Sequence, residues 1–292
     1  MTDTQARPVG PRVPQHRPQS LVLAFFGNHV LDAGHRCVYS GSIIDVLGRA
    51  GVGEQAVRST LSRMVKRGLL LRQRQGRRVY FGLTAQARRV LAEGRRRIWD
   101  EDAVNADWDG TWTLLGFSLP EAWQRQRHSL RSRLLWSGFG PLYSGLWIAP
   151  GEIEVGGILA GLGLTGHAKV FHARAADATD IAAMVRESWD LDGIAARYTG
   201  FGQRWGACAG RGEGAGDAIV VRLRLVTEWL DVIRTDPRLP LRHLPGDWPA
   251  RSAQGVFRAV ADVTAGPARR MAESLVDTVP EPAAAAAPCQ EY

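Results

Sequence analysis

Cysteine is scarce in this sequence, which holds only Cys37, Cys208 and Cys289. The three residues lie far apart, and no two of them form a CxxC pair. Such a small, odd set provides neither a disulfide framework nor the ligands of a structural zinc site. We therefore expect reduced thiols and a cytoplasmic protein.

Long apolar runs are also missing. No window approaches the roughly eighteen consecutive apolar residues of a membrane-spanning helix, so no such helix is expected. Residues 1–18 carry four prolines and no apolar core, which argues against a signal peptide. We expect residues 1–19 to form a flexible arm.

Acidic residues are nearly absent from one stretch of the chain. Residues 49–99 hold 14 Lys or Arg against two acids, whereas the rest of the chain holds 23 bases and 27 acids. The formal net charge of +8 therefore comes from this stretch alone. A solvated surface normally mixes the two signs. The pattern favours a nucleic-acid-binding segment on a near-neutral body.

The order of elements expected in residues 20–99 is that of a winged helix-turn-helix. Three helices precede a β-hairpin with a glycine-bearing basic turn, and a further helix follows. Ser20 and Thr84 are expected to cap the first and the last of these helices. We predict helices at 20–30, 42–47, 54–67 and 84–99, and hairpin strands at 69–71 and 79–81.

Two further domains are expected after an acidic linker at 101–107, which gives an α+β protein. Residues 108–175 have the order βαββαβ of a ferredoxin-like sandwich. We predict strands at 112–119, 140–143, 146–149 and 169–174, and helices at 121–136 and 153–162. Residues 176–277 are expected to form a mainly helical C-terminal domain, with helices at 181–189, 193–205, 218–233 and 253–276. Residues 278–292 are expected to be a disordered tail.

The third helix carries the main functional hypothesis. At 100° per residue, one face is apolar and the opposite face has short polar and basic side chains that could reach base edges in a major groove. The apolar residues are Val57, Leu61, Met64 and Val65. The alternative is a surface helix and hairpin whose arginines only increase solubility, but the lack of acids favours DNA binding. The predicted DNA-binding residues are Gln55, Arg58, Ser59, Ser62, Arg63, Lys66 and Arg67 in the helix, and Arg72, Arg74, Arg77 and Arg78 in the wing.

A second cluster has aromatic and basic residues at helical spacing. Phe201 belongs to it, and its candidate effector-binding members are Arg197, Tyr198, Arg204 and Trp205. They could stack an aryl ring or a nucleotide while the arginines hold phosphates. The alternative is a helix that packs Phe201 and Trp205 inward, and the spacing favours this alternative.

Nothing in the sequence indicates catalysis. There is no GxSxG motif, and no nucleophile and base can be paired. No acid or cysteine accompanies His167, His172 and His243 at the spacing of a metal site. We therefore expect no enzyme activity, no metal and no cofactor.

Several segments resemble the PaaX-like repressors of phenylacetic acid degradation, in order, over about residues 19–262. They are AVRSTLSRMVKRG (56–68), GRRVY (76–80), WDGTW (108–112), GFGPL (138–142), GLWIAP (145–150), DPRLP (236–240) and LPGDWP (244–249). The resemblance implies a winged helix-turn-helix, a Cas2-like ferredoxin-like domain and a helical C-terminal domain in a homodimer. It also implies repression at double-stranded operator DNA that an aryl-acyl-CoA, typically phenylacetyl-CoA, relieves.

Two other functions remain as alternatives. Cas2-like folds can carry a metal-binding aspartate at the end of the first strand, but that strand ends here in Gly116-Phe117-Ser118-Leu119. A Cas2-like nuclease is therefore disfavoured. A CoA-ester-processing enzyme with a DNA-binding arm is disfavoured because no nucleophile–base pair can be assigned. The glycine-rich segment 206–216 and the residues beyond Val263 depart from the family pattern.

Overall fold

The computed structural model describes residues 16–34, 36–209 and 217–281. Most of the expected arm, residues 210–216 of the glycine-rich segment, and residues 282–292 of the expected tail lie outside this description. The chain forms two compact units built from separated segments. The first unit comprises 1–100, 204–229 and 257–292, and the second comprises 101–203 and 230–256. The helices of 176–277 are thus divided between the two units.

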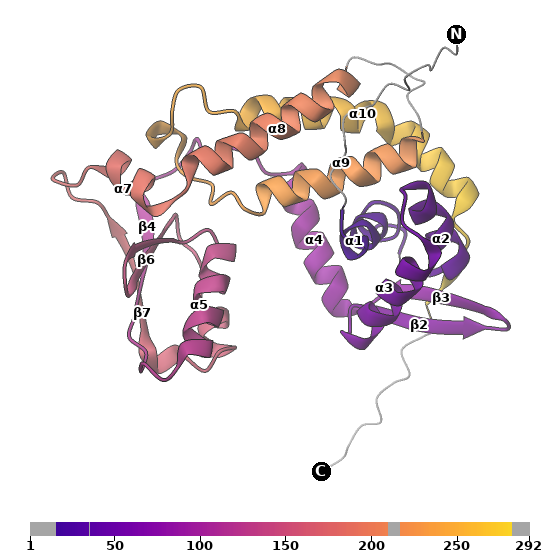
Figure 1. The fold of residues 1–292 in the computed structure, drawn as a ribbon, viewed down its shortest axis with the longest axis horizontal. Helices are drawn as coiled ribbons and strands as arrows, with labels where there is room; N and C mark the ends of the chain where they lie inside the picture. The colour runs from indigo at the N-terminus through magenta and orange to yellow at the C-terminus, as the bar shows by residue number, and fades with distance from the viewer. Residues whose placement is uncertain (1–15, 35, 210–216, 282–292) are drawn as a thin grey trace, which may run out of the picture. The chain divides into compact units, whose positions relative to one another are not determined.

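The first unit begins with a bundle of helices followed by a hairpin (Figure 1). Large apolar side chains of the first three helices are fully buried, among them Phe25, Ile43 and Met64. The first helix begins at Pro18 rather than at the predicted Ser20, because proline already has the backbone angle of a first helical turn. The elements are α1 (Pro18–His29), α2 (Ser40–Arg49), α3 (Glu54–Lys66), β2 (Leu70–Gln75), β3 (Arg78–Leu83) and α4 (Ala85–Trp99).

Local sequence explains where two of these elements turn or start. Gly76, at the tip of the β2–β3 hairpin, has a φ of 59°, which glycine adopts without a steric penalty. The side chain of Thr84 accepts a hydrogen bond from the backbone N–H of Ala87, so the predicted cap of α4 is confirmed.

Two strands complete the sheet of the first unit and were not expected from the sequence. The strand order is β2-β3-β1-β8, with β1 (Arg36–Tyr39) and β8 (Thr278–Pro280) antiparallel. Cys37 lies opposite Val279. The prediction of a disordered tail from residue 278 is therefore wrong for 278–280. A three-residue strand has no periodicity of its own, and pairing with β1 is what orders it.

Three longer helices follow in the chain: α8 (Leu191–Ala209), α9 (Ala218–Ile233) and α10 (Ala250–Leu275). Within the first unit, aromatic residues join their segments to α4. The ring of Phe257 in α10 stacks on Trp229 of α9 at 5.0 Å between centroids, and it contacts Trp99 of α4 at 5.2 Å. None of the described helices has the length and apolarity needed to span a bilayer.

The second unit contains the ferredoxin-like βαββαβ order. All neighbouring strands in the sheet are antiparallel, in the order β5-β6-β4-β7. The second helix is shorter than the predicted 153–162, because glycines at 156 and 157 and at 161 weaken it. The elements are β4 (Thr111–Phe117), α5 (Gln124–Trp136), β5 (Gly140–Tyr143), β6 (Leu146–Pro150), α6 (Gly156–Ala160) and β7 (Ala168–Arg174).

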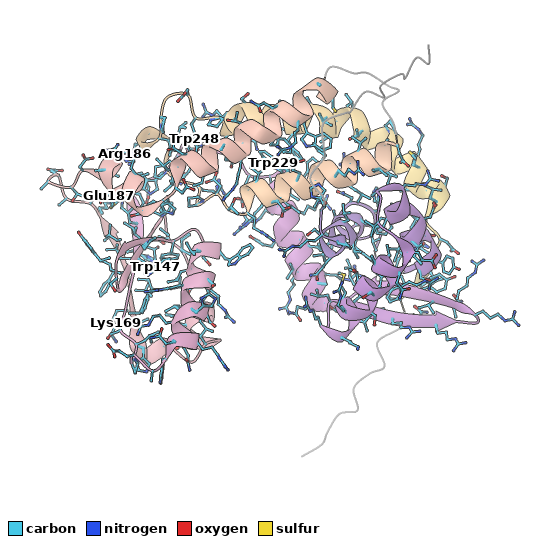
Figure 2. All side chains as sticks on the ribbon, viewed as in Figure 1. Trp147, Lys169, Arg186, Glu187, Trp229 and Trp248 are labelled. Atoms are coloured by element: carbon cyan, nitrogen blue, oxygen red, sulfur yellow. The ribbon has the colours of Figure 1, made fainter. Side chains whose placement is uncertain are left out.

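Each face of this sheet has its own core. On one face, Trp147 packs with Leu130 and Leu134 of α5, and Figure 2 shows Trp147 between the sheet and that helix. On the other face, Trp112 packs with Val185 of α7 (Ile181–Ser188). Because α5 buries only its inward side, its outer side is free to display polar residues.

Candidate nucleic-acid interface

Helix α3 presents a polar and basic side to solvent. Val57, Leu61 and Met64 are buried as predicted, and so is Thr60, whereas Val65 is only half-buried. The exposed side chains of this helix include Gln55, Arg58, Ser59, Ser62, Arg63 and Lys66. The helical periodicity placed five of these residues on the outer face and Arg58 on its flank.

The cations of α3 differ in how far the protein already neutralises them. Arg58 forms an ion pair with Glu54, with 2.7 Å between Nη2 and Oε1, and both side chains are exposed. Arg63 donates to the Thr60 hydroxyl at 3.2 Å. Neither Arg63 nor Lys66 has an acidic partner among the described residues. Arg67 follows the helix and donates to Gln19 at 3.4 Å.

The arginines of the wing also differ in how far the protein already neutralises them. Arg72 and Arg77 are exposed and have no ion pair with any described residue. Arg74 donates to the carbonyl of Gly76 at 3.1 Å. Arg78 instead pairs with Asp277 at 2.7 Å and lies 5.0 Å from the centre of the Tyr39 ring. Asp277 was missed by the sequence reasoning because it is 199 residues away in the chain.

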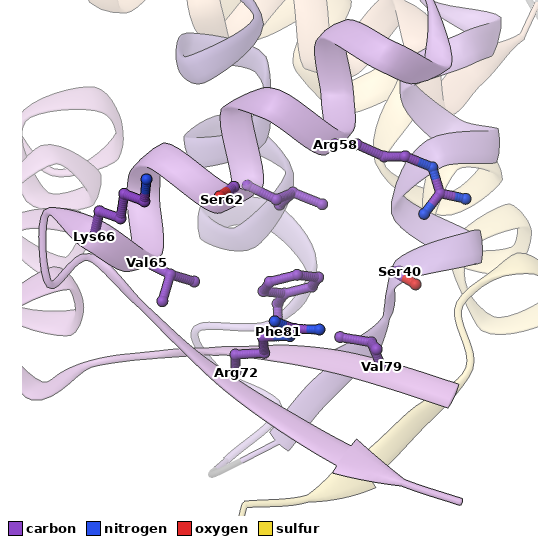
Figure 3. Close-up of a pocket in the computed structure, with 9 residues that line it drawn as sticks. Ser40, Arg58, Ser62, Val65, Lys66, Arg72, Val79 and Phe81 are labelled. Carbon is purple, nitrogen blue, oxygen red and sulfur yellow. The ribbon is translucent and has the colours of Figure 1, made fainter. Parts of the chain in front are cut away.

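A pocket of about 400 Å³ lies between α3 and the wing (Figure 3). Arg58 and Lys66 reach it from the helix, and Arg72 reaches it from β2. None of the residues that line it is acidic. Its lining residues are Ser40, Arg58, Leu61, Ser62, Val65, Lys66, Arg72, Val79 and Phe81.

This arrangement is suited to a polyanion that displays hydrogen-bonding groups, such as the base edges in a groove of duplex DNA. Short serine side chains on α3 allow close approach to a major groove, where arginine can donate to the two acceptors of guanine. A basic hairpin beside that helix can contact the neighbouring phosphates. Four cations of this surface have no acidic partner among the described residues: Arg63, Lys66, Arg72 and Arg77. A phosphate could therefore bind them without displacing a carboxylate.

The candidate effector residues have other contacts. In the second unit, the buried Tyr198 donates to the carboxylate of Asp236, whose pKa burial raises above its usual value. In the first unit, Glu228 accepts from both Arg204 and the indole N–H of Trp205. Only Arg197 is exposed. These contacts are those of a packed helix, and the predicted effector contacts of the cluster stay a prediction.

The histidines do not gather with other metal-ligating side chains. His172 lies 3.6 Å from Glu152, and His243 packs edge-on against Trp108. Within the described ranges, no three or more His, Cys, Asp or Glu residues come together as a metal site.

Family comparisons match all three parts of the chain. The model of a PaaX-like protein matches residues 17–87. The PaaX protein central Cas2-like domain matches residues 105–185, and the PaaX-like protein C-terminal domain matches residues 189–274.

Two individual proteins are similar over nearly the whole chain. The transcriptional repressor PaaX of Escherichia coli (strain K12) is 27% identical over 279 residues, which cover 90% of this chain and 86% of the repressor. The solved structure of the uncharacterized protein Rv0674 from Mycobacterium tuberculosis matches with a TM-score of 0.59 and 22% identity. That match covers 88% of this chain and 98% of the other, and it shows the shared fold. With its N-terminal, central Cas2-like and helical C-terminal parts, the chain belongs to the PaaX-like family of transcriptional regulators.

Proposed function

We propose that the protein represses transcription by binding operator DNA through α3 and the β2–β3 wing. One observation carries the proposal: unpaired cations from α3 and from the wing flank a single pocket that has no acidic lining. The similarity to a transcriptional repressor supports the same function. Within this proposal, Gln55, Ser59, Ser62 and Arg63 read bases, whereas the wing and the flanking cations contact phosphates.

We also propose that the protein acts as a homodimer. The edge strand β7 supports this, because Val170 and Phe171 are exposed on it. The opposite edge, β5, contains Pro141 and an irregular register, both of which discourage strand pairing. An antiparallel second copy centred on Phe171 would place Lys169 opposite Ala173 rather than opposite another cation.

Selection of genomic fragments by the purified protein tests both proposals. We expect one family of fragments with two related half-sites, and native mass spectrometry of the complex should give two chains per duplex. Random binding without a shared site would contradict the operator proposal, and one chain per duplex would contradict the dimer. The same duplexes and single strands, incubated with divalent metals, should stay intact, since cleavage would favour a Cas2-like nuclease.

The wing arginines should contribute unequally to DNA binding. Arg77→Ala should flatten the slope of log affinity against log salt by about one unit, because one phosphate contact is lost. Arg78→Ala is the matched control, since Asp277 already compensates its charge and its effect should be smaller. Titrations on one duplex over a salt series measure both slopes. Equal flattening by the two variants would show that the ion pair opens on DNA.

We further propose that the operon concerns aromatic-acid catabolism of the phenylacetate type and that an aryl-acyl-CoA releases the repressor. A CoA group carries several phosphate charges that need cationic partners, whereas a free aryl acid carries one charge. Outside the DNA-binding stretch, Arg174, Arg186 and Arg197 are exposed. Arg222 and Arg224 donate to backbone carbonyls instead. Because Arg174 already lies 4.0 Å from the carboxylate of Asp109, Arg186 and Arg197 are the first choice for phosphate contacts.

Calorimetry with phenylacetyl-CoA, phenylacetate and coenzyme A tests the effector. Phenylacetyl-CoA should bind most tightly and should release operator DNA in a gel shift. Each tenfold preference for the form that does not bind DNA shifts the balance by about 1.4 kcal/mol. If free phenylacetate binds and releases DNA equally well, the thioester proposal is wrong.

A further inference from the structure

Helix α5 displays a second cationic surface, in the second unit. Its inward side buries Leu130 and Leu134 against the sheet. The residues on its exposed side that we call the α5 basic face are Arg125, His128, Arg131 and Arg133. No Asp or Glu occurs anywhere from residue 122 to residue 151. No acidic residue in this part of the sequence therefore offsets the positive charge of the α5 basic face.

The protein leaves this face unneutralised, although it neutralises other arginines. Arg125, Arg131 and Arg133 have no ion pair with any described residue. By contrast, Arg95 on α4 pairs with Asp32, and Arg96 and Arg97 pair with Glu93. A basic helix that only keeps the protein soluble would normally mix basic and acidic residues. The α5 basic face does not.

The shape of the surface suits an extended polyanion. Arg125, His128 and Arg131 are spaced at i, i+3 and i+6 and so form one row, about 9 Å long, on the surface of the helix. One DNA strand places a phosphate about every 3.4 Å along the duplex axis, so a backbone that follows this row could meet both the Arg125 and the Arg131 guanidinium. Arginine also binds phosphate oxygens with two parallel donors. A free nucleotide or an acyl-CoA fits a concave site better than the outside of a helix.

We propose that the α5 basic face is a second DNA contact, which binds the backbone of the duplex flanking the operator. The proposal rests on operator binding by α3 and the wing. Once these elements hold a duplex, its flanks are present at a high local concentration for α5. The contact adds affinity and salt dependence without adding base specificity.

The test compares duplex lengths. A short duplex carries only the operator, and a long duplex adds flanking sequence on both sides. The wild type should bind the long duplex more tightly and with a steeper salt dependence. The double variant Arg125→Ala/Arg131→Ala should lose the extra affinity for the long duplex. Its slope of log affinity against log salt on that duplex should become flatter by about two units. Its affinity for the short duplex should stay within about twofold of the wild type, as expected if no phosphate contact there is lost.

The matched control is Arg269→Ala/Arg270→Ala, which removes two exposed guanidiniums from α10 and so changes the net charge equally. This control should keep the full length dependence. All four replaced side chains are exposed, and circular dichroism melting should confirm that both variants are folded.

Each outcome decides the proposal. An equal loss on both duplexes, or no loss on either, overturns the α5 contact. Loss of phenylacetyl-CoA or coenzyme A binding with unchanged DNA binding would also overturn it and assign the face to effector phosphates. Specific operator binding without any length dependence overturns the α5 contact alone. If no duplex is bound by the wild type, the operator proposal fails as well.

Discussion

Arg63→Ala is expected to weaken operator binding by about 1–3 kcal/mol, roughly fivefold to 150-fold. The guanidinium lies on the exposed side of α3, and its only described polar contact is the Thr60 hydroxyl of the same helix. A bidentate contact with a guanine edge discriminates against other bases, because the wrong base leaves the donors unpaired. The variant should therefore relax the preference at one base position.

Gel-shift titrations against the operator and a scrambled duplex measure this effect. Arg269→Ala is the matched control, because it removes an exposed arginine from α10 and should change neither affinity appreciably. The loss in Arg63→Ala should be confined to the operator. An equal loss on both duplexes would make Arg63 a phosphate contact.

Glu228→Ala is expected to lower the free energy of unfolding by about 3 kcal/mol, since removing one partner of a buried ion pair leaves the other charge uncompensated. Glu228 is 5% exposed in α9. Its carboxylate accepts from Arg204 Nε at 2.6 Å and from Trp205 Nε1 at 2.8 Å. The variant removes the carboxylate that accepts from both the indole N–H and the half-buried guanidinium.

Urea unfolding followed by fluorescence measures the loss. Glu273→Ala is the matched control, because this exposed carboxylate lies 3.9 Å from Arg269 and surface pairs contribute less than about 1 kcal/mol. The same variant separates the two interpretations of the Arg204–Trp205 cluster. If Glu228→Ala keeps its stability but loses phenylacetyl-CoA binding, these residues serve the effector rather than the helix core.

Elements with a periodic pattern could be predicted from the sequence, and elements defined by distant partners could not. Helix α3 spans Glu54–Lys66, within one residue of the expectation, because its apolar residues repeat at helical spacing and Gly68 follows it. Strand β1 has four residues and lies between two helices, so it offers no alternation to detect. Its two neighbours in the sheet come from far along the chain.

In the candidate site, too, local periodicity predicts some features and cannot predict others. A rotation of 100° per residue is enough to place Arg63 and Lys66 outside and Leu61 inside. No local rule places Asp277 beside Arg78, or Glu228 between Arg204 and Trp205. Ion pairs of this kind depend on how whole helices pack. Equal residue types therefore have different surroundings: Arg77 has no ion pair with any described residue, whereas Arg78 is paired with Asp277.

The pairing of β8 with β1 also has a consequence for synthesis. The outer edge of β1 is covered by residues 278–280, which follow β1 by about 240 residues. At the usual rate of about 5–20 residues per second, the ribosome needs roughly 12–50 s to translate the intervening chain. During that time the nascent sheet has an open edge that can pair with another nascent chain. On a polysome, neighbouring chains would share this exposure. The four-stranded sheet of the first unit is thus completed only after residue 280 has left the ribosome.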